Sequence, residues 1–200
     1  MSQLVQISKA VLRTTTRLAA KQLARRSTGL LSVLLVWGAI ASAQSISGLK
    51  VQDRSHDNDE VDAQLYAHYE IDNTGKVAAP LTSITMRYWF TNENPTDPLV
   101  FACDYALISC SNITSKFVTL PTPVPLANTY LEIGFAAAAG SVTPGQNSGE
   151  IQTRIHHANY SNFFTSQTYS FIGDPSFVYK DTTTVTLYIN GVLVWGTEPI

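Results

Sequence analysis

Apolar and polar residues alternate along most of the chain from Gln64 to the C-terminus. Because successive side chains of a β-strand point to opposite faces of a sheet, a two-residue period predicts strands that are buried on one face. No segment in this part of the chain has a convincing 3.6-residue period, so we expect almost no helix. The alternation is clearest in three segments: ITMRYWF at residues 84–90, YLEIGF at residues 130–135 and IQTRIHH at residues 151–157.

Turn signals separate these segments at short intervals. Asn190-Gly191 lies between two alternating runs, and this dipeptide supplies the two positive-φ residues of a type I′ hairpin turn. Clusters of glycine, proline, asparagine and aspartate divide the rest of the chain. Roughly eight or nine short strands, with no internal repeat, predict a single all-β domain: an antiparallel β-sandwich.

The first 43 residues have a different composition. They contain six lysine and arginine residues and no acidic residue, and a 12-residue apolar run at positions 30–41 leads into Ala41-Ser42-Ala43. This order is typical of a secretory signal peptide, whereas a membrane-spanning helix needs about 20 apolar residues. We expect residues 1–43 to be a signal peptide and residues 44–200 to be the functional domain. The alternatives are an organelle import signal and an uncleaved anchor.

The predicted leader changes the charge of what remains. The whole chain has a formal net charge of −2, from 13 basic and 15 acidic residues. Residues 44–200 keep all 15 acidic residues but only seven of the basic ones, so their net charge is −8. An acidic surface repels phosphate backbones and anionic lipid, so we expect neither nucleic acid nor membrane as a partner. A neutral ligand fits this charge better.

Two cysteines, Cys103 and Cys110, are the only ones in the chain. In an exported protein such a pair favours a disulfide, because a zinc site needs four ligands and a thiol redox motif needs a C-x-x-C spacing. The bond would close a short loop around Asp104 and Tyr105.

Sequence signatures of common enzymes are absent. The chain has no G-x-S-x-G, no H-E-x-x-H and no phosphate-binding loop. Glycoside hydrolysis needs two carboxylates that face each other across a cleft. Asp104, Glu132 and Glu150 are available, but the pattern does not pair them. We therefore expect no catalytic activity.

Several segments occur in a distinctive order: RYWFT, CDYALISCSNIT, FVTL, TYLEIGF, GEIQTRI, NYSNF, TYSF and VTLYINGVLVWGTEP, of which CDYA and NGVLVWGTEP are the most specific. Together they resemble the family 3 carbohydrate-binding modules, which attach bacterial cellulases and cellulosomal scaffolds to cellulose. The resemblance covers residues 48–199, and it implies a nine-stranded jelly roll with a linear strip of aromatic and polar side chains on one flat sheet face.

The resemblance also implies which residues form this strip. Many family members have tryptophan at the last position of the strip, and the strongest binders of crystalline cellulose carry a further aromatic residue on a longer loop after the CDxA motif. Here that loop is short, and Ala102 stands where tryptophan is common. Carried over by position, the strip consists of Asp104, Tyr105, Gln152, Arg154 and Tyr160; we call these five residues the binding strip.

The chemistry of the binding strip suits a sugar. A pyranose ring presents C–H groups on its faces and hydroxyls around its rim, so a flat aromatic ring covers the face and an Arg–Asp pair binds the rim. Platforms two strands apart would lie roughly 10 Å apart, close to the repeat of a β-1,4-linked disaccharide. Other roles are open: Tyr105 and Tyr160 can pack inside the fold, and Arg154 can pair with an acid across a ladder.

The family also holds a structural calcium ion between two loops. Calcium prefers several oxygen ligands that include carboxylates, but the matching positions here offer one carboxylate, with Phe164 beside it. We expect a degenerate site, no required cofactor, and closure of the loop by packing of Phe163 and Phe164. The matching positions are Thr91 and Glu93 in the first loop and Gln167 and Thr168 in the second.

Together these observations predict a secreted, monomeric, non-catalytic domain that binds cellulose or a related β-1,4-glucan through one flat face. The alternative is a secreted structural or adhesive surface domain that kept the fold and lost glucan binding. The altered binding strip and the short loop after residue 106 favour this alternative.

Overall fold

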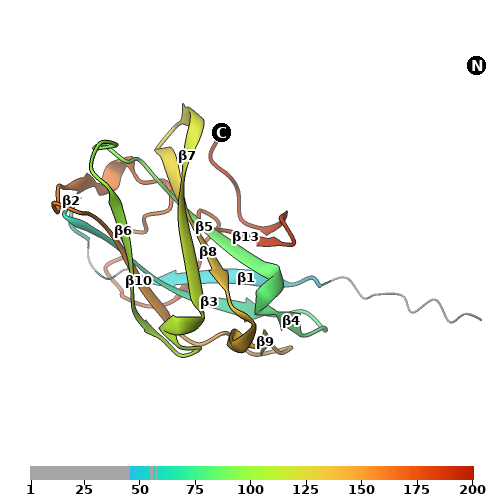
Figure 1. The fold of residues 1–200 in the computed structure, drawn as a ribbon. Coiled ribbons are helices and arrows are strands. Elements are labelled where there is room, and N and C mark those ends of the chain that lie inside the picture. The colour runs from blue at the N-terminus through green and yellow to red at the C-terminus, as the bar shows by residue number, and fades with distance from the viewer. Residues whose placement is uncertain (1–45, 55, 57) are drawn as a thin grey trace, which may run out of the picture. The chain divides into compact units, whose positions relative to one another are not determined.

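The computed structural model describes residues 46–54, 56 and 58–200, all within one unit of the chain, Ala43–Ile200. The predicted signal peptide lies outside the described residues. Two five-stranded antiparallel sheets form a sandwich (Figure 1), as the alternating pattern predicts. Among the described residues, no helix is long and apolar enough to cross a membrane.

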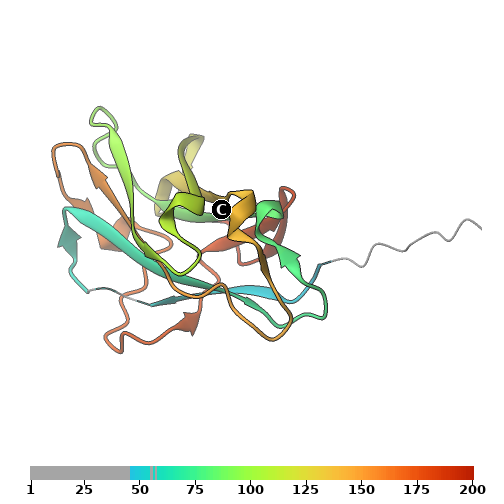
Figure 2. The ribbon, with the colours of Figure 1, turned by 60° about the horizontal axis from the view of Figure 1, so that its bottom comes forward.

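Each sheet combines strands that are distant in the sequence. The first sheet contains, in spatial order, β12 (Lys180–Asp181), β1 (Leu49–Arg54), β3 (Gln64–Asn73), β10 (Ile151–His157) and β6 (Leu99–Ala106). The second contains β14 (Val192–Trp195), β13 (Thr186–Ile189), β5 (Ile84–Phe90), β8 (Ala127–Phe135) and β7 (Ile113–Val124). Figure 2 shows the two layers from another side, with β1 and β3 in one and β7 and β8 in the other.

Short elements connect the strands and add two small pairs. Because these pairs raise the number of strands, the structure does not confirm the expected count of nine. The pairs are β2 (Val61–Asp62) with β11 (Phe163–Phe164) and β4 (Ala79–Pro80) with β9 (Ser141–Val142). Single 3₁₀ turns form η1 (Leu81–Ser83), η2 (Cys110–Asn112), η3 (Ala137–Ala139) and η4 (Thr165–Gln167).

The core lies between the two sheets. Val51 and Ile71 of the first sheet and Met86 and Leu131 of the second belong to one apolar cluster, and all four are at most 1% exposed. Removing apolar surface from water contributes about 25 cal/mol per Å² to stability. This burial fixes which face of each strand points inward, and the other faces remain for function.

The last two strands form the hairpin that the sequence predicts. Asn190 and Gly191 have φ angles of 50° and 80°, as a type I′ turn requires. The turn joins β13 to β14 in antiparallel pairing.

Asp53 lies on the buried face of β1. Its side chain is only 4% exposed, and its Oδ1 atom has no hydrogen-bond partner among the described residues. Burial raises the pKa of Asp53 well above its usual range, against the opposing effect of hydrogen bonds from the backbone of His68 and Arg54. The folded protein therefore favours the neutral carboxyl group.

The substitution Asp53→Asn is expected to raise the free energy of unfolding at about pH 7 by about 1–2 kcal/mol. Because folding raises the pKa, the folded state binds the proton more tightly, and Asp53 lowers stability increasingly as the pH rises above its unfolded pKa of about 4. Urea unfolding at about pH 7 and about pH 4 measures this difference. If Asp53→Asn raised the free energy of unfolding by the same amount at both pH values, the raised pKa of Asp53 would be contradicted.

Candidate functional site

The five residues of the binding strip come together on the outer face of the first sheet. Gln152 and Arg154 alternate with buried residues along β10 and point away from the core. Tyr105 lies directly opposite Gln152 on β6, and Asp104 precedes it. Tyr160 follows the end of β10. The structure thus brings the residues to one surface although they are up to 56 positions apart in the sequence.

A β-bulge lets Asp104 and Tyr105 face outward together. Tyr105 pairs with Gln152, but the next pair joins Cys103 to Thr153, so Asp104 is the extra residue on β6. In a regular strand, neighbouring side chains would point to opposite faces, and one of these two would be buried. The bulge re-aims Asp104, and both side chains are exposed.

The predicted disulfide joins Cys103 to Cys110, with 5.7 Å between their Cα atoms. Both cysteines pack against the core cluster. The bond closes the loop that leaves the bulged end of β6, so it anchors the backbone next to Asp104 and Tyr105.

Arg154 is the centre of the polar part of the binding strip. Its Nε atom donates to Asp104 Oδ1 at 2.9 Å, and its terminal nitrogen donates to Gln64 Oε1 at 2.8 Å. Gln64 in turn donates to the hydroxyl of Tyr66 at 2.7 Å. The alternative role of Arg154, an ion pair with an acid across the ladder, is therefore observed, and the acid is Asp104 of the same strip. Held at two points, the guanidinium group keeps its remaining donors in a fixed direction.

Tyr160 lies flat on the same face. Its ring stacks on His156 with 4.4 Å between centroids and 4° between planes, and it is 51% exposed. Tyr105 is 45% exposed. The alternative in which these two tyrosines pack in the interior is wrong.

The two aromatic platforms follow the strand direction, which corrects the expected arrangement. Tyr105 lies beside Gln152 and Tyr160 lies over His156, so both belong to the β6–β10 pair. Four residues of strand separate Gln152 from His156, a distance of about 13 Å. The platforms are therefore not two strands apart, because β10 presents outward side chains at both of its ends.

Neighbouring strands extend this face with residues that the sequence analysis missed. Tyr66 on β3 pairs with Arg154, and its ring stacks on His56 with 4.2 Å between centroids. His68, on the same strand, has a pKa lowered to about 4 by burial and by the charges of Arg54 and His56. Alternation along β3 could have placed Tyr66 and His68 on an outer face. Only the register of β3 against β10 places Tyr66 beside Arg154 and His68 beside Gln152.

The carboxylates do not form a catalytic pair. Glu132 lies in the second sheet, where it bonds Arg87 and Lys116. Glu150 accepts hydrogen bonds from Arg54 at 2.6 Å and from the hydroxyl of Tyr179 at 3.0 Å. Burial acts to raise the pKa of Glu150, but hydrogen bonds from Gln152 and Tyr179 outweigh it and lower the pKa. A carboxylate with a lowered pKa, paired with an arginine, is poorly suited to serve as a general acid.

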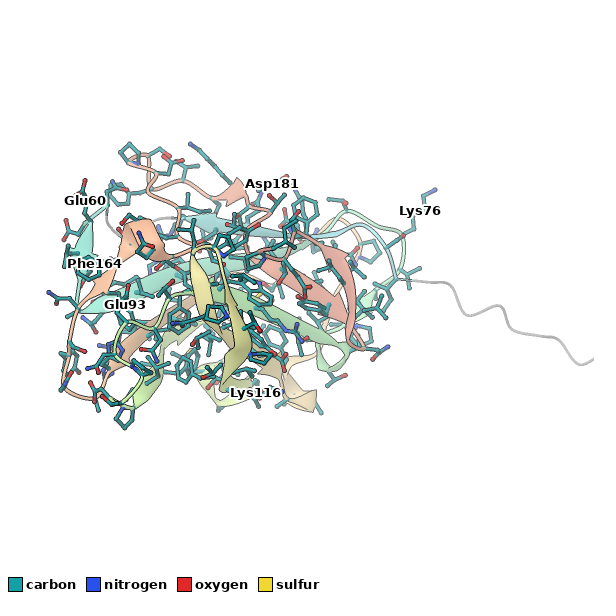
Figure 3. The ribbon with its side chains drawn as sticks, turned by 90° about the horizontal axis from the view of Figure 1, so that it is seen from above. Glu60, Lys76, Glu93, Lys116, Phe164 and Asp181 are labelled. Atoms are coloured by element: carbon teal, nitrogen blue, oxygen red, sulfur yellow. A yellow bond between two sulfur atoms is a disulfide. The ribbon has the colours of Figure 1, made fainter. Side chains whose placement is uncertain are left out.

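The positions that match the calcium ligands of the family bond to each other and to neighbouring backbone groups. Glu93 Oε1 accepts the backbone N–H of Phe164 at 3.2 Å, and the two residues lie at the same end of the sandwich (Figure 3). The Gln167 carbonyl accepts the N–H of Thr91, and the hydroxyl of Thr168 donates to the Phe164 carbonyl. Across the described ranges, no three acidic, histidine or cysteine side chains lie close enough to bind a metal ion. With one carboxylate, these residues do not fit calcium.

The expected closure of this loop by two phenylalanines is half correct. Phe163 is fully buried, but Phe164 is 47% exposed. Adjacent residues of β11 point to opposite faces, so only one of them can reach the core.

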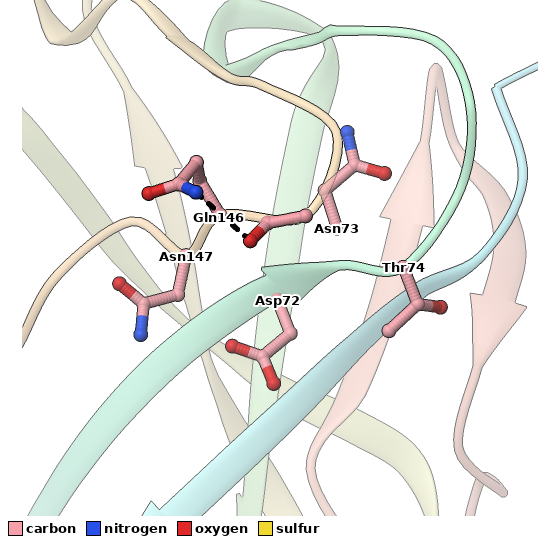
Figure 4. Close-up of a pocket in the computed structure, with 6 residues that line it drawn as sticks. Asp72, Asn73, Thr74, Gln146 and Asn147 are labelled. Carbon is pink, nitrogen blue, oxygen red and sulfur yellow. Dashed lines mark hydrogen bonds between the residues drawn. The ribbon is translucent and has the colours of Figure 1, made fainter.

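A separate polar hollow of about 170 Å³ lies at the C-terminal end of β3 (Figure 4). Its walls include Asp72, Asn73 and Asn147, and none of its residues belongs to the binding strip. Since Gln64 and Tyr66, which contact the strip, are at the other end of β3, the hollow is not part of this site.

This β-sandwich carries two exposed tyrosines and a paired arginine on one sheet face, and comparison with known families gives its class, a non-catalytic carbohydrate-binding module. The family model described as "Cellulose binding domain" matches residues 50–196. The chain therefore belongs to this family, the family 3 carbohydrate-binding modules, as its sequence segments indicate.

Relatives and solved structures agree with this membership. Endoglucanase A of Paenibacillus lautus is 40% identical over 76% of this chain and 21% of its own length. Cellulosomal-scaffolding protein B of Acetivibrio thermocellus is 35% identical over 77% of this chain and 20% of its own length. The CBM3b structure from the major scaffoldin ScaA of Acetivibrio cellulolyticus is 30% identical with a TM-score of 0.72, over 78% of this chain and 100% of that one.

The chain corresponds to a small part of most of these proteins. It spans between 9% and 21% of the first four curated relatives that it matches. A further relative, the uncharacterized protein in the celA 5′ region of Paenibacillus lautus, is 34% identical and is covered over 100% of its length.

Replacing both cysteines by serine is expected to lower the free energy of unfolding by roughly 2–3 kcal/mol, because the open loop regains entropy in the unfolded chain. Guanidinium unfolding measures this loss. The wild-type protein measured with and without reductant provides the matched comparison. If the oxidised and reduced wild-type proteins were equally stable, the disulfide would not have the proposed stabilising role.

Proposed function

We propose that this domain binds cellulose or a related β-1,4-glucan through the binding strip. The observation that carries the proposal is the convergence of all five strip residues on one outer sheet face, with Arg154 bonded to Asp104 at 2.9 Å. Membership of the cellulose-binding family supports the ligand class.

The two tyrosines supply the contact area. A ring stacked on a pyranose face removes roughly 50 Å² of apolar surface from water, worth about 1–1.5 kcal/mol. One such contact is weak. Because Tyr105 and Tyr160 are fixed on one rigid face and a glucan chain is itself rigid, the second contact forms at high effective concentration after the first.

The polar residues supply orientation. Arg154 and Asp104 hold each other in place, so they meet the sugar hydroxyls without first losing rotamer freedom. Gln152 lies beside them on β10 and adds an amide with donors and an acceptor. The disulfide at Cys103 limits movement of the β6 end in the same way.

The protein is expected to act outside the cell, as a monomer. The leader sequence and the cellulosomal relatives support export. The acidic charge of residues 44–200 supports a neutral polymer as the ligand rather than nucleic acid or lipid.

Purified protein is expected to be depleted from solution by microcrystalline cellulose, and Tyr105→Ala and Arg154→Ala are each expected to weaken this retention about 5- to 10-fold. Such a change corresponds to about 1–1.5 kcal/mol, the size of one stacked ring or one charge-assisted hydrogen bond. Sedimentation with cellulose, followed by quantification of the unbound protein, gives the isotherms. Amorphous cellulose and chitin distinguish the preferred polymer.

Two variants serve as matched controls. Phe164→Ala removes an aromatic ring that is 47% exposed, close to the 45% of Tyr105, but outside the binding strip. Lys116→Ala removes a cation of the second sheet that also pairs with an acid. Both are expected to bind normally. If the folded protein stays in solution with every polysaccharide, the proposal fails and a structural or adhesive surface role remains.

We also propose that the fold needs no calcium. The direct bonds of Thr91 and Glu93 to the second loop, at Gln167 and Phe164, support this. The melting temperature is expected to change by less than about 1 °C between EDTA and millimolar calcium, since a ligand stabilises a protein only when it binds the folded state. Differential scanning calorimetry in both buffers checks this expectation, and a rise of several degrees with calcium would overturn it.

A further inference from the structure

Tyr66 lies on the outer face of the first sheet, beside the binding strip but outside it. Its neighbours on β3, Leu65 and Ala67, are buried, so the ring of Tyr66 points outward. Its partner on β10 is Arg154. Since β3 flanks β10 on the side opposite to β6, which carries Tyr105, aromatic rings lie on both sides of Arg154.

The ring of Tyr66 is one half of a stacked pair. Its centroid is 4.2 Å from that of His56, with 22° between the ring planes. His56 is exposed, whereas Tyr66 is half-buried. The same arrangement occurs at the end of β10, where the exposed ring of Tyr160 stacks on His156, which is only 9% exposed. In both pairs an inner ring supports an outer one, and we call His56 and Tyr66 the side stack.

Hydrogen bonds fix the side stack relative to Arg154. Gln64 accepts from the terminal nitrogen of Arg154 at 2.8 Å and donates to the hydroxyl of Tyr66 at 2.7 Å. The backbone N–H of Gln64 itself donates to Asp62 Oδ1 at 3.0 Å. The side stack and the binding strip are therefore held at a set spacing before any ligand arrives, which lowers the ordering cost of a joint contact.

The side stack does not lie in line with the two platforms of the binding strip. That line runs from Tyr105, opposite Gln152, to Tyr160, over His156. With strands about 4.8 Å apart and about 3.3 Å between residues along a strand, Tyr66 lies roughly 7 Å to the side of it. A β-1,4-glucan chain is a single ribbon of pyranose rings, and stacking needs the sugar directly above the aromatic ring. A chain that covers Tyr105 and Tyr160 therefore leaves the side stack uncovered.

We propose that the side stack is a third platform, which takes a second glucan chain lying beside the first, so that the domain prefers an ordered surface of parallel chains to a separate chain. This inference rests on the proposed function, since the binding strip is taken to hold the first chain. Crystalline cellulose presents chains side by side at a fixed spacing, whereas amorphous cellulose presents them singly. Only the crystalline form engages all three platforms together.

The first test compares two forms of one polymer. Tyr66→Ala is expected to weaken retention by microcrystalline cellulose about 5- to 10-fold, and retention by amorphous cellulose less than about 2-fold. Arg154→Ala removes a contact with the first chain, so it should weaken both by a similar factor. Depletion isotherms on the two supports give the affinities. The proposal is overturned if Tyr66→Ala loses as much on amorphous as on microcrystalline cellulose, or loses nothing on the latter.

A second test separates contact with the ligand from support of Arg154 through Gln64. Tyr66→Phe keeps the ring but not the bond to Gln64, so its retention by microcrystalline cellulose should stay within about 2-fold of the wild type. The double variant Tyr66→Ala/Arg154→Ala should lose the product of the two single effects, because the two residues contact different chains. If Tyr66→Phe is as weak as Tyr66→Ala, or the double variant is no weaker than Arg154→Ala, Tyr66 only supports Arg154. These variants also decide the question if amorphous cellulose retains too little protein.

Further variants guard against unfolding and nonspecific loss. His56→Ala removes an exposed ring, so it leaves the core intact, and it should weaken retention by microcrystalline cellulose selectively, by about 2- to 5-fold. No loss in a folded His56→Ala protein contradicts the side stack. Tyr130→Ala is the matched control: Tyr130 is a half-buried tyrosine of the second sheet, 4.7 Å from the ring of Trp89, and its removal should leave retention unchanged. Thermal melts confirm that each variant is folded.

The wild-type protein keeps this inference apart from the proposed function. If the wild type is retained by cellulose and Tyr66→Ala is retained equally well by the microcrystalline form, the side stack is not a platform, while the binding strip keeps its role. If the folded wild type is retained by no glucan, the proposed function fails, and the third platform fails with it.

Discussion

The site depends on one irregularity of backbone pairing, the bulge at Asp104. Regular alternation along β6 would bury either Asp104 or Tyr105, and Arg154 would then lose its carboxylate partner or the strip would lose a platform. The inserted residue turns both outward, while Cys103 on its inner side stays against the core and is bonded to Cys110. Core packing, the disulfide and the Arg154–Asp104 pair thus all stabilise the same short segment of β6, residues 103–105.

Charges on the outer face of the first sheet are mostly compensated by neighbours. Arg154 pairs with Asp104, and Arg54 pairs with Glu150, which also accepts from Tyr179. A face built this way is polar without a strong field, and these paired groups hold one another in place. Such a surface suits a neutral, rigid polymer better than it suits an ion.

The opposite end of β10 reaches the same rigidity by other means. Tyr160 has a φ angle of 58°, unusual for an aromatic residue, and hydrogen bonds through His157 hold the loop in that conformation. Where the family resemblance implies calcium between two loops, this chain has direct contacts of Glu93 with Phe164 and of His157 with Asn92. One end of the binding strip therefore rests on a covalent bond and the other on buried polar contacts.

The sequence alone determined the strands, the hairpin at Asn190-Gly191, the disulfide and the family, because these follow from local periodicity, turn chemistry, cysteine spacing and specific motifs. Tertiary structure decided the rest. A two-residue period says which side chains share a face but not which residues of two distant strands lie opposite each other. The bulge at Asp104, the line of the platforms along β10, the exposure of Phe164 and the buried contacts of His157 all depend on that register and on pairings between remote segments.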